Sequence, residues 1–173
     1  MAQSYENTIN IHLGGAYGDK RKAANTWVKN YKRLSKSLKS RLTIENDDKI
    51  SLFNTQELID SVHQDLGIPI MFDFHHHRLY PVSGENEQDT VNKAIATWPD
   101  DITPVFHWSE SKAKEYDDDT IKLAAHSDLC YGPIPEYSTT KPIDLMIEAK
   151  HKEKSIPLIK YGNGQTVQSK PVQ

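Results

Sequence analysis

The chain has 173 residues, of which 36% are hydrophobic and 26% charged, a balance typical of one globular domain with a substantial core. Its net charge of −3 gives no general support for nucleic-acid binding, so any contact with DNA must come from a local patch or from metal ions. The single cysteine, Cys130, cannot form an internal disulfide, and no apolar run has the length of a signal peptide or membrane span. These features predict an intracellular protein with no membrane partner.

Short apolar strands alternate with helices along the chain. The predicted strands span residues 8–12, 42–45, 68–74, 103–107 and 143–148. The predicted helices span residues 21–39, a segment that begins after Asn54 or Thr55 and ends before Gly67, residues 88–98, and a final segment after the fifth strand. The pattern is that of repeated βα units.

Each predicted strand has, at its last or second-last position, a residue that commonly binds metal ions. These residues are His12, Glu45, Asp73, His107 and Glu148. The intervals between them are roughly 30 to 40 residues, the length of a strand, a helix and two loops. Parallel strands bring their carboxyl ends to one edge, where barrel active sites are built. The sequence therefore predicts an α/β fold of the TIM (β/α)8-barrel type with a metal-dependent site.

Five strands are too few to close such a barrel, which usually needs about 250 residues. We expect residues 1–161 to form a partial barrel of about five C-terminal βα units, and residues 162–173 to form a disordered tail. An unpaired edge strand and a half-open core favour association. The remaining strands are expected from an N-terminal half-barrel or from a second copy of the chain.

Two further histidines, His76 and His126, join the candidate ligands. Strand alternation would place His75 on the same face as Asp73, whereas a turn after Phe74 would bring His76 beside it. A single histidine or acid at the end of a strand is more often a structural residue or a helix cap than a metal ligand. Five consecutive strands that all end in this way are much less common by chance.

Imidazole and carboxylate ligands together suit zinc, manganese and iron. Seven candidates are too many for one ion, so two or three ions bridged by a carboxylate are expected. Clustered divalent ions favour phosphoester hydrolysis, because they generate hydroxide at neutral pH and hold the attacking and leaving oxygens.

Six motifs occur in order in the chain: IHLGGAYGDK, LTIENDD, FDFHHH, FHWSE, AHSD and MIEAK. From about Asn10 to Glu153 they resemble the UV-damage endonucleases, whose barrel is related to that of the apurinic-site endonucleases. The resemblance implies a metal-dependent DNA-repair enzyme that nicks damaged double-stranded DNA 5′ to cyclobutane dimers and other lesions. It also implies manganese as the favoured ion, with zinc as an alternative.

The resemblance assigns roles to individual residues. It implies that His12 and Glu45 bind a first metal, with Glu45 bridging, and that Asp73, His107 and Glu148 complete a second site. His76 and His126 would hold a third metal. Glu45 and Lys150 are the candidate catalytic residues, and the expected role of Lys150 is to contact the phosphate.

Two departures from the family pattern bear on activity. Nothing in the chain corresponds to the family's N-terminal half, which supplies further metal-binding histidines and the residues that probe the lesion. Some members also have a lysine where this chain has Val105. We predict that the isolated chain binds metal weakly and incises poorly or not at all.

Two alternatives to the nuclease remain open. A sugar isomerase or epimerase on a related barrel also gathers acids and histidines around a divalent ion, although the triple histidine and the many ligands argue against it. A catalytically inactive remnant would keep the fold and lose the chemistry.

Overall fold

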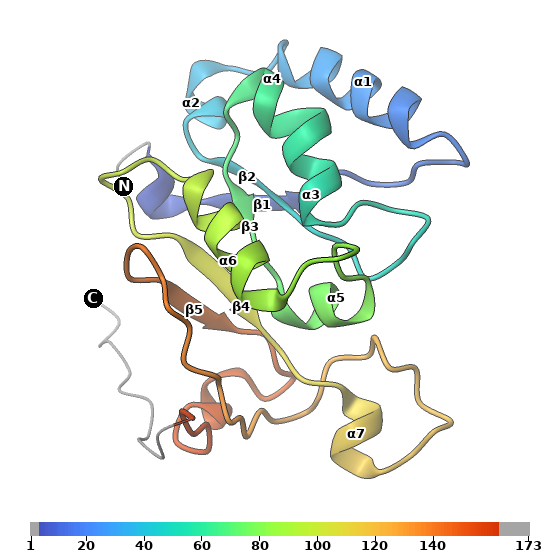
Figure 1. Cartoon of the computed structure of the whole chain (residues 1–173), viewed down its shortest axis with the longest axis vertical. Coiled ribbons are helices and arrows are strands. Elements are labelled where there is room, and N and C mark those ends of the chain that lie inside the picture. Colours follow the sequence, from blue (N-terminus) through green and yellow to red (C-terminus); the bar gives the residue numbers. More distant parts are fainter. Residues whose placement is uncertain (1–3, 163–173) are drawn as a thin grey trace.

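The computed structural model describes residues 4–162, and five parallel strands follow one another across it in chain order (Figure 1). The first ladder contains β1 (Ile9–His12), β2 (Leu42–Glu45) and β3 (Ile70–Met71), and the second contains β4 (Val105–Trp108) and β5 (Asp144–Ile147). A parallel bridge between Asp73 and His107 joins the two ladders, and the His107 amide donates a hydrogen bond to the Phe72 carbonyl at 2.9 Å. The predicted α/β fold with parallel strands is therefore confirmed.

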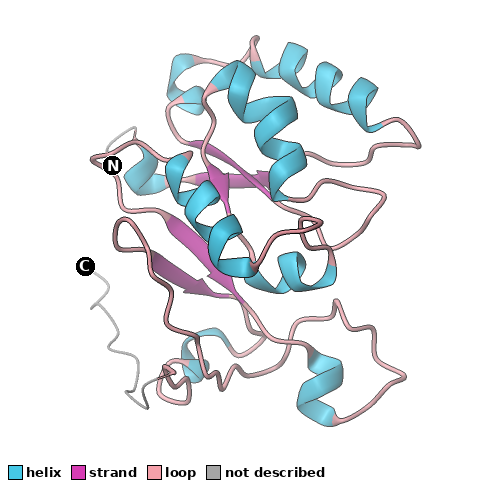
Figure 2. Cartoon of the chain, viewed as in Figure 1, coloured by secondary structure: helices cyan, strands magenta, loops and turns pink. Residues whose placement is uncertain are grey.

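Helices cover the sheet in the order that βα units require (Figure 2). The longer ones are α1 (Lys20–Tyr31), the continuous segment of α3 (Thr55–Leu58), η2 (Ile59–His63) and α4 (Gln64–Leu66), and α6 (Glu87–Ala96). Buried residues of α1 share one apolar cluster with Ile44 of β2, and buried residues of α6 share another with Phe106 of β4. Burial of these two clusters holds the helices on the strands.

The shorter helices are η1 (Tyr5–Asn7), α2 (Lys36–Lys39), α5 (Phe74–Leu79), α7 (Lys112–Tyr116) and η3 (Lys152–Ser155). The sequence prediction includes neither η1 nor α7, and it differs from the structure at the other three. The predicted helix 21–39 divides into α1 and α2, because Ser35 takes an extended conformation and its hydroxyl caps α2. The third strand ends early, since the Asp73 side chain accepts a hydrogen bond from the His76 amide and starts α5. The final helix is the single turn η3.

The predicted start and end of the helix after β2 are confirmed. Asn54 and Glu57 form a reciprocal capping box at its start. Gly67 ends it with a φ of 66°, a conformation in which a side chain would be strained.

The outer strands of the sheet each have one neighbour. Within residues 4–162, β1 pairs with β2 alone and β5 pairs with β4 alone. A cavity of about 1310 Å³ opens beside β5, and Ile134, Leu145 and Ile147 are among the apolar residues that line it. Closure of a barrel stays a prediction, and the predicted tail falls, from residue 163 onward, outside the described residues. No helix in the described part of the chain is long and apolar enough to cross a membrane.

Candidate metal centre

The register of the parallel strands brings the predicted strand-end residues together. His12 of β1 lies opposite Glu45 of β2, and the bridge between Asp73 and His107 continues the same edge toward β4. Glu148 follows β5 directly, and its amide donates to the Trp108 carbonyl at 2.9 Å. The five predicted residues therefore face one another across the carboxyl end of the sheet.

Glu45 lies at the centre of this group and is buried. Its Oε1 lies 3.3 Å from Nδ1 of His76 and 3.3 Å from Nδ1 of His107. Its Oε2 lies 3.8 Å from Nε2 of His12 and also accepts a hydrogen bond from the Asn10 side chain. One carboxylate thus faces three imidazoles.

Two sets of potential ligand atoms meet at Glu45. His12, Glu45 and His76 form the first set, and within it the ligand atoms all lie within 4.8 Å of one another. The second set meets the same limit and consists of Glu45, Asp73, His107 and Glu148. A shared carboxylate between two such sets is the arrangement in which one oxygen-donor group bridges two ions.

Two buried side-chain atoms of residues in the second set have no hydrogen-bond partner. They are Oδ2 of Asp73 and Nδ1 of His107. The His107 atom lies 3.2 Å from Oε1 of Glu148 without a bonding geometry. Leaving a buried polar atom unsatisfied costs about 1–3 kcal/mol, which a cation between these atoms would offset. The nitrogen and oxygen donors fit manganese, zinc or iron.

Residues just after β2 orient the ligands. The Asn46 side chain accepts a hydrogen bond from the Asp73 amide at 2.8 Å and donates to the Asp73 carbonyl at 3.0 Å. Oδ1 of Asp47 lies 3.0 Å from Nδ1 of His12, which leaves Nε2 of that ring toward Glu45. Such outer contacts fix the tautomer and orientation of metal ligands. Sequence reasoning missed these roles, although the AsnAspAsp run after the strand was the available signal.

The cluster perturbs the acidity of its own members. Burial alone would raise the pKa of Glu45, but the imidazoles of His107 and His76 hold that pKa well below its usual value. Burial would lower the pKa of His76, yet contacts with Glu45 and Asp73 raise it to about 9. Burial raises the pKa of Asp73. The carboxylates therefore favour the protonated form of the His76 imidazole, and a divalent ion would compete with that proton on binding.

The structure separates the three consecutive histidines. The turn after Phe74 brings Nδ1 of His76 to 3.9 Å from Oδ1 of Asp73. The ring of His77 packs on Phe72 instead, with centroids 5.1 Å apart. The ring of His75 is buried and lies 5.6 Å from that of His126.

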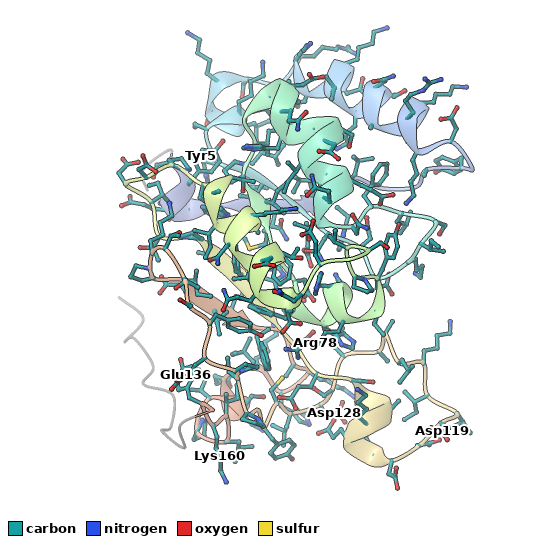
Figure 3. The ribbon with its side chains drawn as sticks, in the orientation of Figure 1. Tyr5, Arg78, Asp119, Asp128, Glu136 and Lys160 are labelled. Carbon is teal, nitrogen blue, oxygen red and sulfur yellow. The ribbon has the colours of Figure 1, made fainter. Side chains whose placement is uncertain are left out.

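The other two predicted site residues lie at the margin. Nδ1 of His126 is 3.6 Å from Oε2 of Glu148, outside the two ligand sets. Nζ of Lys150 lies 3.9 Å from Oδ1 of Asp128, which also accepts a hydrogen bond from Lys112 of α7. Figure 3 shows Asp128 close to α7. The Lys150 ammonium is thus directed toward an acid outside the ligand sets.

Known proteins resemble this chain over most of its length. The sequence profile of the family described as UV-endonuclease UvdE matches residues 1–165. The UV DNA damage endonuclease of Bacillus velezensis is 33% identical over 163 residues, which cover 90% of this chain and 48% of that protein. The UV-damage endonuclease of Schizosaccharomyces pombe is 39% identical over 151 residues, which cover 84% of this chain and 24% of that protein.

A solved structure agrees with these relatives. The crystal structure of SacUVDE matches with a TM-score of 0.69 and 27% sequence identity, over 86% of this chain and 48% of that one. The chain therefore spans about half the length of SacUVDE and of the Bacillus relative.

Proposed function

Because the chain belongs to the UV-endonuclease UvdE family, we propose that it supplies the metal centre of an endonuclease that nicks damaged double-stranded DNA 5′ to UV photoproducts. The observation that carries the proposal is Glu45, a buried carboxylate shared by two sets of ligand atoms. Two-ion centres of this kind are typical of phosphodiester hydrolysis, and the relatives named above are UV-damage endonucleases. The proposed ions are two or three Mn²⁺, with Zn²⁺ as the alternative.

Each residue of the cluster has a proposed role. Glu45 would bridge two ions, with His12 and His76 on one side. Asp73, His107 and Glu148 would complete the second site, and the contact of His126 with Glu148 supports a third position beside it. When bound, the ions would stabilise charge on the phosphate oxygens and lower the pKa of water. The expected products are a 3′-hydroxyl and a 5′-phosphate.

Lys150 is proposed as a phosphate contact on weaker grounds. Its side chain is two-thirds exposed and follows Glu148 closely in sequence, so it can turn toward a bound strand. Its ion pair with Asp128 spans 3.9 Å, and exposed pairs of this kind contribute little energy. Breaking the ion pair with Asp128 would therefore cost Lys150 little free energy.

We further propose that additional βα units cover the open side of the sheet. Apolar residues such as Leu145 and Ile147 line part of the cavity beside β5, and β1 and β5 each lack a second neighbour in the described residues. About half of the SacUVDE chain has no counterpart in this match. An eight-stranded barrel needs three strands beyond the five present here. A UvdE-type N-terminal half-barrel could supply three, whereas a second copy of this chain would bring five. The barrel would then be complete, and the ligands on β1 and β5 would be covered.

A nicking assay tests the proposal. The substrate is a duplex with one cyclobutane dimer, incubated with Mn²⁺ and either this chain alone or this chain mixed with the unmatched half of the Bacillus velezensis enzyme. We expect a cut 5′ to the dimer in the mixture, little or none with the chain alone, and none with Glu45→Gln. Equal cutting by Glu45→Gln would contradict the proposed centre. A folded chain that binds no Mn²⁺ in either setting would instead indicate an inactive remnant.

A further inference from the structure

Basic residues are concentrated in one segment of the chain. Residues 20–41, which comprise α1, α2 and the turns beside them, contain nine lysines and arginines and no aspartate or glutamate. The whole chain has 21 basic and 24 acidic residues, so the remainder carries twelve basic residues against all 24 acidic ones. The net charge of −3 therefore conceals a strong separation of charge.

Most of these cations are exposed, and Figure 3 shows nitrogen-tipped side chains pointing outward from α1 and α2. We call the exposed set the α1–α2 basic face, and it consists of Arg21, Lys22, Lys29, Lys32, Arg33 and Lys36. Lys22 and Lys29 are seven residues apart, so they share one side of α1, opposite the buried Ala24 and Val28. Arg21, Lys22 and Lys29 also line a shallow depression of about 480 Å³.

The acidic residues near the α1–α2 basic face do not neutralise its positive charge. Glu57 pairs with Lys20, which is not part of the face, at 2.7 Å. Asp19 lines the depression, and its carboxylate caps the helix by accepting from the Lys22 amide. Asp60 lies on η2, which packs against α1, and is bound by Gln56. Within residues 4–162, none of the six cations forms an ion pair with any of these acids.

An exposed aromatic residue marks the end of this face nearest the metal centre. Tyr17 lies in the loop between His12 and α1 and is 98% exposed. Its φ of 49° is in the left-handed region, which costs a residue with a side chain about 1 kcal/mol or more. The backbone thus holds the Tyr17 ring in solvent, in the loop that follows the candidate ligand His12 at the end of β1. Aromatic rings beside cations are typical of surfaces that bind single-stranded nucleic acid, where the rings stack on unpaired bases.

We propose that the α1–α2 basic face binds the phosphate backbone of duplex DNA beside the damaged site, and that Tyr17 contacts the DNA between that face and the metal centre. This inference rests on the proposed nuclease function. Helix α1 is about 18 Å long, which matches about five base pairs of duplex. An anionic membrane surface fits less well, because α1 buries its apolar side in the core and has none left to insert.

The test is binding of an undamaged 30-base-pair duplex, measured by fluorescence anisotropy at several salt concentrations in EDTA, so that neither metal nor nicking is involved. The test variant is Lys22→Gln/Lys29→Gln/Arg33→Gln. The matched control is Lys114→Gln/Lys154→Gln/Lys160→Gln, which removes the same charge from exposed positions elsewhere. A third variant, Tyr17→Ala, separates the ring from the charges. Vesicles that contain phosphatidylserine provide the comparison surface.

We expect the test variant to bind roughly tenfold or more weakly, and the slope of log affinity against log salt to fall by about 0.9 for each cation removed. The control should lose much less, and Tyr17→Ala should weaken binding without changing the slope. Equal losses in the test and control variants would show that net charge alone matters and would overturn the inference. Loss of vesicle binding with unchanged DNA binding would also overturn it. Because nicking is measured separately, failure of this surface is distinguishable from failure of the metal centre.

Discussion

The ligands on the central strands of the sheet differ from those on its edges. The side chains of Glu45, Asp73 and His107 are 5%, 0% and 6% exposed, whereas those of His12 and Glu148 are 43% and 33% exposed. Central strands have neighbours on both sides that fix each ligand, but β1 and β5 have one neighbour each within residues 4–162. The central ligands are therefore preorganised for a metal, whereas the ligands on the edge strands depend on what covers those strands.

The largest effect is expected at the shared carboxylate. Glu45→Gln keeps the shape of the side chain but removes the charge that both ligand sets use, so Mn²⁺ affinity should fall about 100-fold or more. Isothermal titration calorimetry measures the affinity, and circular dichroism verifies the fold. Glu57→Gln is the control, because Glu57 binds Lys20 away from the cluster. Unchanged Mn²⁺ binding by Glu45→Gln would contradict the claim that the ligands on the central strands dominate metal binding.

Metal removal should destabilise the chain. Mn²⁺ at 100 times its dissociation constant stabilises a folded protein by about 2.7 kcal/mol. For a domain of this size, that corresponds to a Tm higher by roughly 5–10 °C. Thermal melts with Mn²⁺ and with EDTA measure the difference. Glu45→Gln should melt at nearly the same temperature in both conditions, and a full Mn²⁺-dependent shift in that variant would contradict the role of Glu45.

Edge ligands should matter less than the centre. His12→Asn and His126→Asn should each weaken Mn²⁺ binding by only about tenfold, because solvent already reaches these rings and water can replace them. Titration calorimetry on both variants measures the loss. Addition of the complementary half-barrel should enlarge it, as the edges become covered. A loss at either edge equal to that of Glu45→Gln would remove the difference between the two regions.

The smallest effect is expected at Asp73, and it has the opposite sign for stability. Asp73→Asn should raise the stability of the metal-free chain by about 1 kcal/mol, because burial disfavours the ionised form of Asp73 and raises its pKa, whereas asparagine has no charge to bury. The asparagine oxygen can still accept from the His76 amide. Urea unfolding in EDTA measures the change, with the exposed Asp60→Asn as control. A metal-free chain that became less stable would show that the central carboxylates serve the fold rather than metal binding.

The convergence of the strand-end residues could be predicted from the sequence. The spacing of the apolar runs indicates repeated βα units, and such units place their strands parallel to one another. The sequence left the choice between His75 and His76 open, since only the capping contact of Asp73 decides where the third strand ends. Ser35 divides the helix predicted over residues 21–39, because its backbone is extended and its hydroxyl caps α2.

The outer contacts of the cluster were harder to predict. Asn46 and Asp47 follow β2 in sequence, but their partners Asp73 and His12 come from other strands. Lys150 stands close to Glu148 in sequence, yet its ammonium faces Asp128. Side-chain direction after a strand ends depends on the tertiary path of the loop, which periodicity does not encode.

The shared role of Glu45 is the central claim, and electron paramagnetic resonance of the Mn²⁺-loaded chain tests it most directly. Two ions bridged by one carboxylate should lie close enough to couple magnetically. We predict at least two Mn²⁺ per chain with a coupled spectrum, and loss of that coupling in Glu45→Gln. A single uncoupled Mn²⁺ per chain, unchanged in Glu45→Gln, would contradict the account.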